Sequence, residues 1–280
     1  MMDERCFPNP FPDLEEGASY SIPDSLSSII SASIRDLLVY VSSPSSYAAL
    51  LGVSTASVLP PDDGTVYTGS GGLALLHLKL GNPARAEQLA STALQSVSRS
   101  RLTFLCGAPG LLSIQAVARH RTGGAGAAAG LGPLLARAQE VAELPSSVPD
   151  ELLYGRAGYL YTLLWLRSEL GEAAVPSGLV RRVVEAILRS GQSLARSTKS
   201  RSPLMFAWHE RCYLGAAHGL AGILAVLLQA RDHLTPAELE ELVRPSLQQL
   251  LATQLESGNF PSSKGKAGKD RLVQWCHGKY

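Results

Sequence analysis

The chain has 280 residues, of which 45% are hydrophobic and 18% charged, so it is long enough to bury a sizeable core. A net charge of +1 excludes a global electrostatic attraction to nucleic acid or to an anionic membrane. The four cysteines lie far apart, which excludes the disulfide framework of a small secreted protein. The longest apolar run, 220–228, is too short to span a bilayer, and residues 1–12 lack the apolar segment of a signal peptide. We therefore expect a cytoplasmic protein that binds no nucleic acid.

The N-terminal part is predicted to hold an irregular arm over residues 1–23 and then two helices, over 24–41 and 46–52. Asp24 is suited to cap the first of these helices, because its carboxylate can accept a hydrogen bond from a backbone N–H that has no partner within the helix. We expect this part and the rest of the chain to form a single domain over residues 1–280.

A degenerate repeat follows, in which the pattern Gly-x-x-Gly begins an apolar helical segment. The pattern occurs four times, and Gly278 would begin a fifth copy; the four copies lie at 69–72, 107–110, 155–158 and 219–222. Each interval between copies has room for two helices and their loops, which is typical of a helical repeat array.

The intervening segments agree with this interpretation, since an apolar helix after each glycine pair alternates with an amphipathic one. The clearest predicted helices are 73–80, 84–97, 159–170, 179–195, 223–231 and 235–254. The last should begin with Thr235 as its cap, followed by Pro236 and Glu238. Strand signals are sparse, so the fold class is all-α, with apolar helices inside and amphipathic helices outside in a toroid or solenoid.

The repeated glycines allow two interpretations. They permit close helix packing and unusual φ angles where a helix begins. Alternatively, several helix N-termini could face one cavity, where their free N–H groups would suit an anionic ligand.

Three residues are candidates for chemistry. Cys276, in Cys276-His277-Gly278, is either a metal-ligating thiolate or a buried structural cysteine. His218, between small residues at a helix start, either transfers protons near neutral pH or packs at the helix end. Glu151 lies at a similar junction, as a second acid or base or as a helix-capping charge.

Other residues at these junctions have more ordinary interpretations. Tyr154 and Arg156 could be donors at the rim of an anion site, or Arg156 could form a surface ion pair. Cys106 and Cys212 are interpreted as small core residues, and Arg5 would on its own be a solvated terminal side chain.

Seven motifs together resemble the eukaryotic LanC-like proteins, relatives of the bacterial lanthionine synthetase C component. In chain order they are Arg5-Cys6-Phe7-Pro8-Asn9-Pro10, Tyr67-Thr68-Gly69, Phe104-Leu105-Cys106-Gly107, Glu151-Leu152-Leu153-Tyr154-Gly155-Arg156-Ala157-Gly158-Tyr159, Gly215-Ala216-Ala217-His218-Gly219, Ser257-Gly258-Asn259-Phe260-Pro261-Ser262-Ser263 and Trp275-Cys276-His277-Gly278. The resemblance runs from residue 1 to residue 278.

The resemblance implies an α/α toroid like that of the six-hairpin glycosidases, with a central zinc site. It implies an enzyme that adds the thiol of glutathione to dehydroalanine or dehydrobutyrine in peptides or proteins, with the metal holding the thiolate and an acid protonating the enolate. By position, Cys276 matches a zinc ligand, His218 the active-site histidine, Glu151 an acidic residue of the bacterial enzymes, and Arg5 an arginine that contacts glutathione. The resemblance also implies a protein of the cytoplasm that can in addition associate peripherally with the plasma membrane.

The sequence departs from the family pattern at its end. The family continues past Cys-His-Gly through two more repeats that carry the remaining zinc ligands, whereas here Lys279-Tyr280 close the chain. We therefore expect a C-terminally truncated toroid that binds zinc weakly and has impaired activity. Two other function classes stay open: a catalytically inactive glutathione-binding or regulatory protein, and a glycosidase-like enzyme with paired carboxylates.

Overall fold

The computed structural model describes residues 26, 28–34, 36, 63–124, 130–143, 148–265, 270 and 275–276. The chain divides into two compact units, Met1–Pro61 and Asp62–Tyr280. In the first unit the described residues are helical and fall within the predicted helix 24–41. The Asp24 cap, the helix 46–52 and the arm 1–23 lie outside the described residues, and a single domain over 1–280 stays a prediction.

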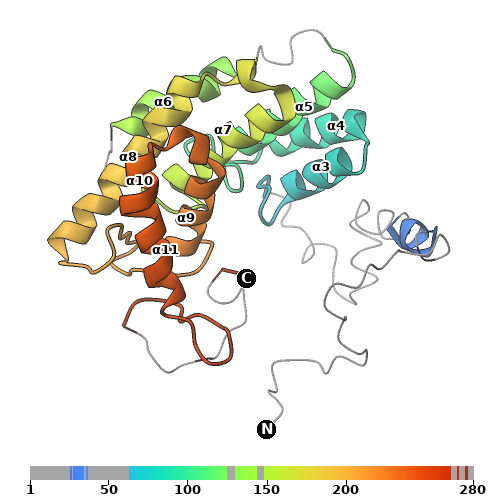
Figure 1. The fold of residues 1–280 in the computed structure, drawn as a ribbon. Coiled ribbons are helices and arrows are strands. Elements are labelled where there is room, and N and C mark those ends of the chain that lie inside the picture. The colour runs from blue at the N-terminus through green and yellow to red at the C-terminus, as the bar shows by residue number, and fades with distance from the viewer. Residues whose placement is uncertain are drawn as a thin grey trace. The chain divides into compact units, whose positions relative to one another are not determined.

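The second unit is built from helices (Figure 1). Their bounds are α3 Ser70–Lys79, α4 Pro83–Ala93, α5 Ala108–Arg121, α6 Gly132–Ala142, α7 Arg156–Leu170, α8 Ser177–Ser197, α9 Leu220–Gln229, α10 Pro236–Glu238 and α11 Arg244–Leu251. Extended pairing among the described residues is limited to two isolated bridges, Trp208 with Arg211 and Tyr213 with Ser263. The predicted all-α class is confirmed. No helix in the described part of the chain is long and apolar enough to cross a membrane.

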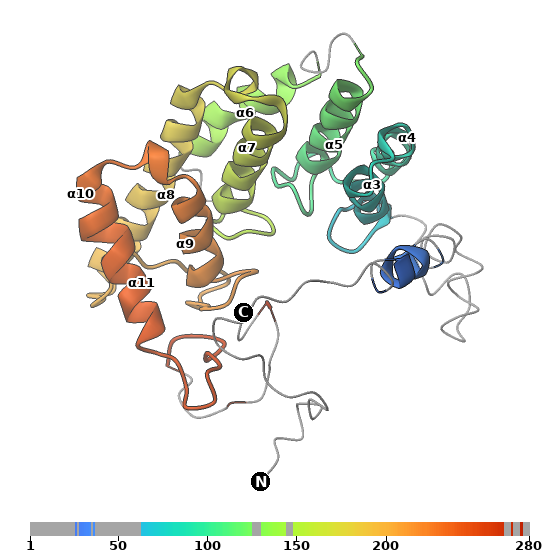
Figure 2. The same ribbon diagram turned by 45° about the vertical axis from the view of Figure 1, so that its right-hand side comes forward.

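The helices of this unit form two curved layers (Figures 1 and 2). The inner row is α3, α5, α7 and α9, in which each helix contacts the next, while α4, α6, α8 and the α10–α11 segment lie outside it. Each inner helix begins at one Gly-x-x-Gly motif, as predicted, and its first residue directly follows the first glycine, which is earlier than the predicted starts after the second glycine. This alternation of inner and outer helices is the arrangement of an α/α toroid.

Sequence pattern accounts for which helix lies in which layer. Inner α5 is buried along most of its length, from Ala108 to Ala118, because neighbours cover it on several sides. Outer α8 buries a single stripe with helical spacing, including Val180, Val183, Val184 and Ile187. The apolar and the amphipathic segments of the sequence therefore take the positions that their periodicity predicts.

Local hydrogen bonding and a proline account for the start of the last outer helix and for its π-helical segment. Thr235 Oγ1 accepts a hydrogen bond from the Glu238 N–H at 3.2 Å, and Glu238 Oε2 accepts one from the Thr235 N–H at 2.8 Å, so the predicted cap is a capping box. The π-helical segment Leu239–Val243 follows, just before Pro245, which has no N–H to continue an α-helical ladder.

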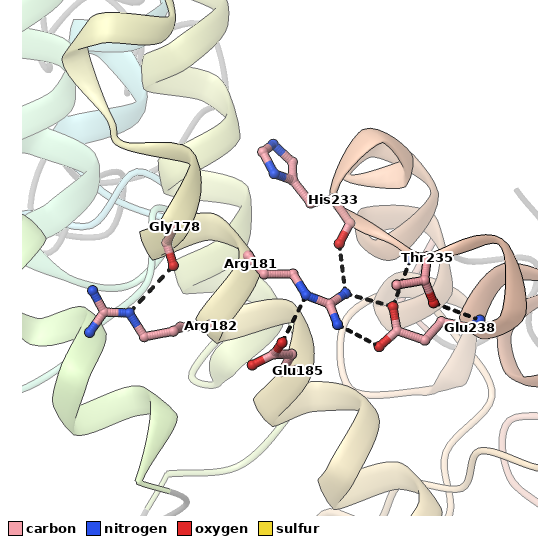
Figure 3. A network of polar contacts seen from close by, with 7 residues as sticks. All are labelled: Gly178, Arg181, Arg182, Glu185, His233, Thr235 and Glu238. Carbon is pink, nitrogen blue, oxygen red and sulfur yellow. Dashed lines mark hydrogen bonds and ion pairs between the residues drawn. The ribbon is translucent and has the colours of Figure 1, made fainter.

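The same cap anchors α10 to α8 through Arg181 (Figure 3). The guanidinium donates to both carboxylate oxygens of Glu238, at 2.6 and 2.8 Å, and to the His233 carbonyl at 2.8 Å. Hydrogen bonding to Glu238 raises the pKa of Arg181, and the Arg181 partner lowers the pKa of the Glu238 carboxyl. A bidentate pair of this kind fixes the angle between two neighbouring outer helices.

The eight motif glycines lie where two segments of backbone come too close for a side chain to fit between them. A Cβ on the first glycine of any copy would lie 2.1–2.5 Å from the backbone of the residue six positions earlier. A Cβ on the second glycine would lie 1.9–2.8 Å from the carbonyl oxygen six positions earlier. The first glycines have φ between −117° and −128°, so the expectation of unusual φ angles is wrong and packing explains these residues.

Candidate functional site

Four equivalent turns precede the inner helices, and in three of them a side chain caps the turn from the same position. That side chain belongs to the residue four positions before the first glycine. Thr65 Oγ1 accepts the Thr68 N–H at 3.2 Å, and Thr103 Oγ1 accepts the Cys106 N–H at 3.3 Å. In the third turn this position is Glu151, whose oxygens accept the N–H groups of the second and third residues that follow it.

Hydrogen bonds join each turn to the next and gather the helix N-termini. The Tyr67 N–H donates to the Leu105 carbonyl at 2.9 Å, and Thr103 Oγ1 donates to the Leu153 carbonyl at 2.5 Å. The chain of contacts continues from Leu152 N–H to the Ala217 carbonyl at 3.2 Å, and from Ala216 N–H to the Trp275 carbonyl at 3.3 Å. Residues far apart in sequence are thus brought to one end of the inner row.

At this end the structure brings together two predicted residues, Glu151 and His218. Glu151 Oε2 lies 2.7 Å from His218 Nδ1 and also accepts the Leu153 N–H at 3.0 Å. The Glu151 side chain is 2% exposed and that of His218 14%. Because the carboxylate oxygen accepts at Nδ1, this nitrogen carries a proton.

The imidazole of His218 also packs against two aromatic rings, whose centroids lie 5.9 Å from each other, so both rings are on the same side of the site. The Trp208 ring stacks on it with centroids 3.9 Å apart and planes at 9°, and the Tyr154 ring lies 6.0 Å away at 22°. The stack and the carboxylate together hold the ring in one orientation. This is the restraint that a residue transferring a proton to a defined atom requires.

Sequence reasoning missed Trp208, which a tight hairpin delivers to the site. The N–H and carbonyl groups of Trp208 and Arg211 pair at 2.9 and 3.1 Å, around His209 and Glu210 with φ of 46° and 61°. Left-handed φ is uncommon for residues other than glycine, so the turn carries local strain, which surrounding contacts such as the stack of Trp208 on His218 offset. No repeat copy contains an equivalent tryptophan, so the repeat pattern carries no signal for it.

Cys276 lies against the same group of turns. It packs on the buried cluster formed by Cys106, Leu153 and Ala217, on which Tyr154 also packs. Ala217 directly precedes His218, so Cys276 and His218 belong to one end of the inner row. Among the residues that the structure describes, no three His, Cys, Asp or Glu side chains gather as a metal would need. His277 and Arg5 lie outside the described residues.

The two interpretations of Arg156 are both wrong. Its side chain is buried, and it donates to Asp150 Oδ1 at 2.9 Å, to the Val148 carbonyl at 2.6 Å and to the Val141 carbonyl at 3.2 Å. Burial raises the pKa of Asp150, although hydrogen bonds from Ser190 and Arg156 oppose the rise. Arg156 is therefore a structural brace between the third turn and α6.

The two remaining cysteines differ from each other. Cys106 is buried, and burial raises the pKa of its thiol to about 11, so the core interpretation holds for it. Cys212 is only half-buried and is not in the hydrophobic core.

Comparison with known proteins identifies the family. The profile of the lanthionine synthetase C-like proteins matches residues 60–280. The chain is 35% identical over 296 residues to glutathione S-transferase LANCL1 of Danio rerio, an alignment that covers 99% of this chain and 70% of that protein. It is 37% identical over 240 residues to the LanC-like protein GCL1 of Arabidopsis thaliana, covering 78% of this chain and about half, 53%, of that one. With its four glycine-marked inner helices and the site at their N-termini, this chain belongs to the lanthionine synthetase C-like family.

Proposed function

We propose that this chain catalyses the addition of a thiol, that of glutathione, to dehydroalanine or dehydrobutyrine in peptides or proteins. The observation that carries the proposal is the Glu151–His218 pair, with its 2.7 Å hydrogen bond. Family membership and the printed name of the Danio rerio relative, a glutathione S-transferase, support the reaction class.

The proposed reaction is a conjugate addition. The thiolate sulfur forms a bond to Cβ of the dehydroamino acid, and the electron pair of the Cα=Cβ bond moves onto Cα and its carbonyl as an enolate. A proton then goes to Cα, so the product is a saturated thioether. An acid close to Cα accelerates this last transfer, and groups of this kind contribute about 10²–10⁴-fold in enzymes.

His218 is the acid of this proposal, and Glu151 is its positioning residue. With Nδ1–H bonded to Glu151, the imidazolium delivers its second proton from Nε2, and the carboxylate stabilises the charged ring. Glu151 also accepts two backbone N–H groups, so its own position is fixed by the turn.

Zinc has a place in the proposal as the group that would hold the thiol as a thiolate. Cys276 would contribute one ligand. The residues that the structure describes do not complete a zinc site around it, so no step is derived through the metal. Arg5 stays a prediction for a glutathione contact, as does peripheral association with a membrane.

The test is a reaction of the purified chain with glutathione and a dehydroalanine peptide, followed by mass spectrometry for the addition of one glutathione. His218→Gln should lower kcat by about 10²-fold or more, and Glu151→Gln by less. His120→Gln, at the exposed end of α5, is the matched control and should leave the rate unchanged.

The outcomes separate the candidate functions. An unchanged rate in His218→Gln would contradict the proposal. Binding of glutathione without any addition would favour the second candidate, a catalytically inactive glutathione-binding or regulatory protein. Metal analysis of the wild type and of Cys276→Ala measures whether zinc is held through this cysteine.

A further inference from the structure

Arg101 is an exposed cation held in a fixed position at the edge of the site. Its guanidinium carbon lies 4.2 Å from the centroid of the Tyr154 ring, the ring that stacks on His218. Arg101 precedes Gly107 by six residues, and its carbonyl oxygen occupies the space that a Cβ on Gly107 would fill. Both the backbone and the charged head of Arg101 are therefore constrained, which is unusual for an exposed arginine.

Within the described part of the chain, the N–H groups of this guanidinium have no hydrogen-bond acceptor, and Arg101 forms no ion pair there. Arg137, in contrast, lines the same pocket but donates to both carboxylate oxygens of Glu140, at 3.1 and 3.3 Å, and to the Arg99 carbonyl at 3.0 Å. Of these two arginines, Arg101 is the one whose N–H donors can serve a ligand.

The pocket beside Arg101 has a volume of about 730 Å³ and adjoins the proposed catalytic site. Arg101, Tyr154, Trp208 and His209 line it. Tyr154 and Trp208 also stack on His218, so the pocket and the imidazole share these two aromatic neighbours, although His218 itself does not line the pocket. The Glu140 carboxylate of this pocket is already paired with Arg137, so among the described residues that line the pocket no carboxylate is left to pair with Arg101.

We propose that Arg101 binds a carboxylate of the thiol substrate and selects anionic thiols such as glutathione over neutral ones. The inference rests on the proposed function and adds to it a residue that determines specificity. A planar guanidinium offers two parallel N–H groups that match the two oxygens of a carboxylate. Stacking on Tyr154 orders the side chain before the ligand arrives, so less conformational entropy is lost on binding.

The experiment compares glutathione with its diethyl ester, in which both carboxylates are blocked. Binding is measured by titration calorimetry, and turnover with the dehydroalanine peptide. Arg101→Gln should weaken binding of glutathione about tenfold, which corresponds to about 1.4 kcal/mol, and change binding of the diester by less than about twofold. Arg101→Lys keeps the positive charge but loses the two parallel N–H donors of the guanidinium, so its affinity for glutathione should lie between those of the wild type and Arg101→Gln.

Arg137→Gln is the matched control, since it removes a cation from the same pocket whose donors are already used. It should change the affinity for glutathione by less than about twofold. Circular dichroism on each variant verifies that the helices are retained.

Each outcome decides the proposal. Equal weakening for glutathione and the diester would show that Arg101 acts by holding Tyr154, and would overturn carboxylate recognition. Unchanged affinity for glutathione in Arg101→Gln, or no binding of glutathione by the wild type, would also overturn it. Selective weakening of glutathione binding in a chain that never adds the thiol would support Arg101 while refuting the proposed function.

Discussion

At the scale of single residues, one change of side chain separates a structural turn from a candidate active site. Thr65, Thr103 and Glu151 occupy the same place in successive turns and cap them alike. A threonine has one side-chain oxygen, and that of Thr103 both accepts in its own turn and donates to the Leu153 carbonyl of the next turn. The carboxylate of Glu151 has two, and Oε2 reaches His218 while still accepting a backbone N–H. A residue that caps a repeat thus also orients a histidine 67 positions away.

Cys106 shows the opposite case, a thiol in the same cluster that burial makes unreactive. Its pKa of about 11 keeps it protonated near neutral pH, and the thiolate is the reactive form. Iodoacetamide at pH 8 should therefore leave Cys106 unmodified in the folded chain and modify it after denaturation, as measured by peptide mass spectrometry. Half-buried Cys212 is the internal reference. Modification of native Cys106 as fast as Cys212 would contradict this.

The same raised pKa predicts a loss of stability at alkaline pH. Between the ordinary thiol value of 9.0 and about 11, the unfolded chain releases the Cys106 proton while the folded chain retains it. The free energy of unfolding therefore falls as pH rises through this window, by roughly 2–3 kcal/mol at most. Urea denaturation at several pH values should show that the free energy of unfolding falls less over this range in Cys106→Ala than in the wild type.

At the scale of elements, the position of the site depends on how the turns are braced from outside. Arg156 begins α7, yet its side chain turns away from the site toward α6, where it meets Asp150 and two carbonyl groups. Asp150 also accepts from Ser190 of α8 at 2.6 Å. The third turn, which carries Glu151, is therefore tied to two outer helices.

Arg156→Met should destabilise the chain strongly. Removing the guanidinium leaves the buried Asp150 carboxylate without a cation, although Ser190 still donates to it, and leaves two carbonyls without this donor, which costs about 3–5 kcal/mol for pairs of this kind. Arg137→Met breaks an exposed pair with Glu140 and should cost less than about 1 kcal/mol. The measurement is the midpoint of urea denaturation. If both variants lost the same small amount of stability, the buried Arg156–Asp150 pair would not be a structural brace.

At the scale of the whole second unit, the inner row leaves a large apolar groove. It has a volume of about 550 Å³ and is lined by residues of α7, α9 and α11 together with Trp275. Leu228 is 37% exposed, Leu251 51% and Trp275 43%, so the groove is partly open to solvent. An open apolar groove of this size is a surface on which small apolar molecules bind.

The groove should bind the dye 1-anilinonaphthalene-8-sulfonate, with an increase in dye fluorescence. The double variant Leu228→Gln/Leu251→Gln should reduce this increase several-fold, because both side chains line the groove. Leu76→Gln changes a similarly exposed leucine, at 38%, that does not line the groove, and should have no effect. Equal fluorescence in all three proteins would place the dye elsewhere.

The sequence by itself determined the fold class and the order of the inner helices. Helical periodicity, the Gly-x-x-Gly pairs and the Thr235–Glu238 cap are local signals, because each depends on residues within one or two turns of helix. The predicted helix 159–170 is observed as Arg156–Leu170, for example, and 179–195 as Ser177–Ser197. Glu151, His218 and Cys276 were also named from the sequence, first by residue type and position at predicted helix starts and then by resemblance to a family.

Only the tertiary structure decided how those residues are used. Arg156 looked like a rim residue, and its burial follows from an acid and two carbonyls that other segments supply. Trp208 and Arg101 join the site because a strained hairpin and a neighbouring turn deliver them to the rings of His218 and Tyr154. Such contacts join segments with no fixed spacing in sequence. They exist only once the repeats have packed against one another, so no local pattern encodes them.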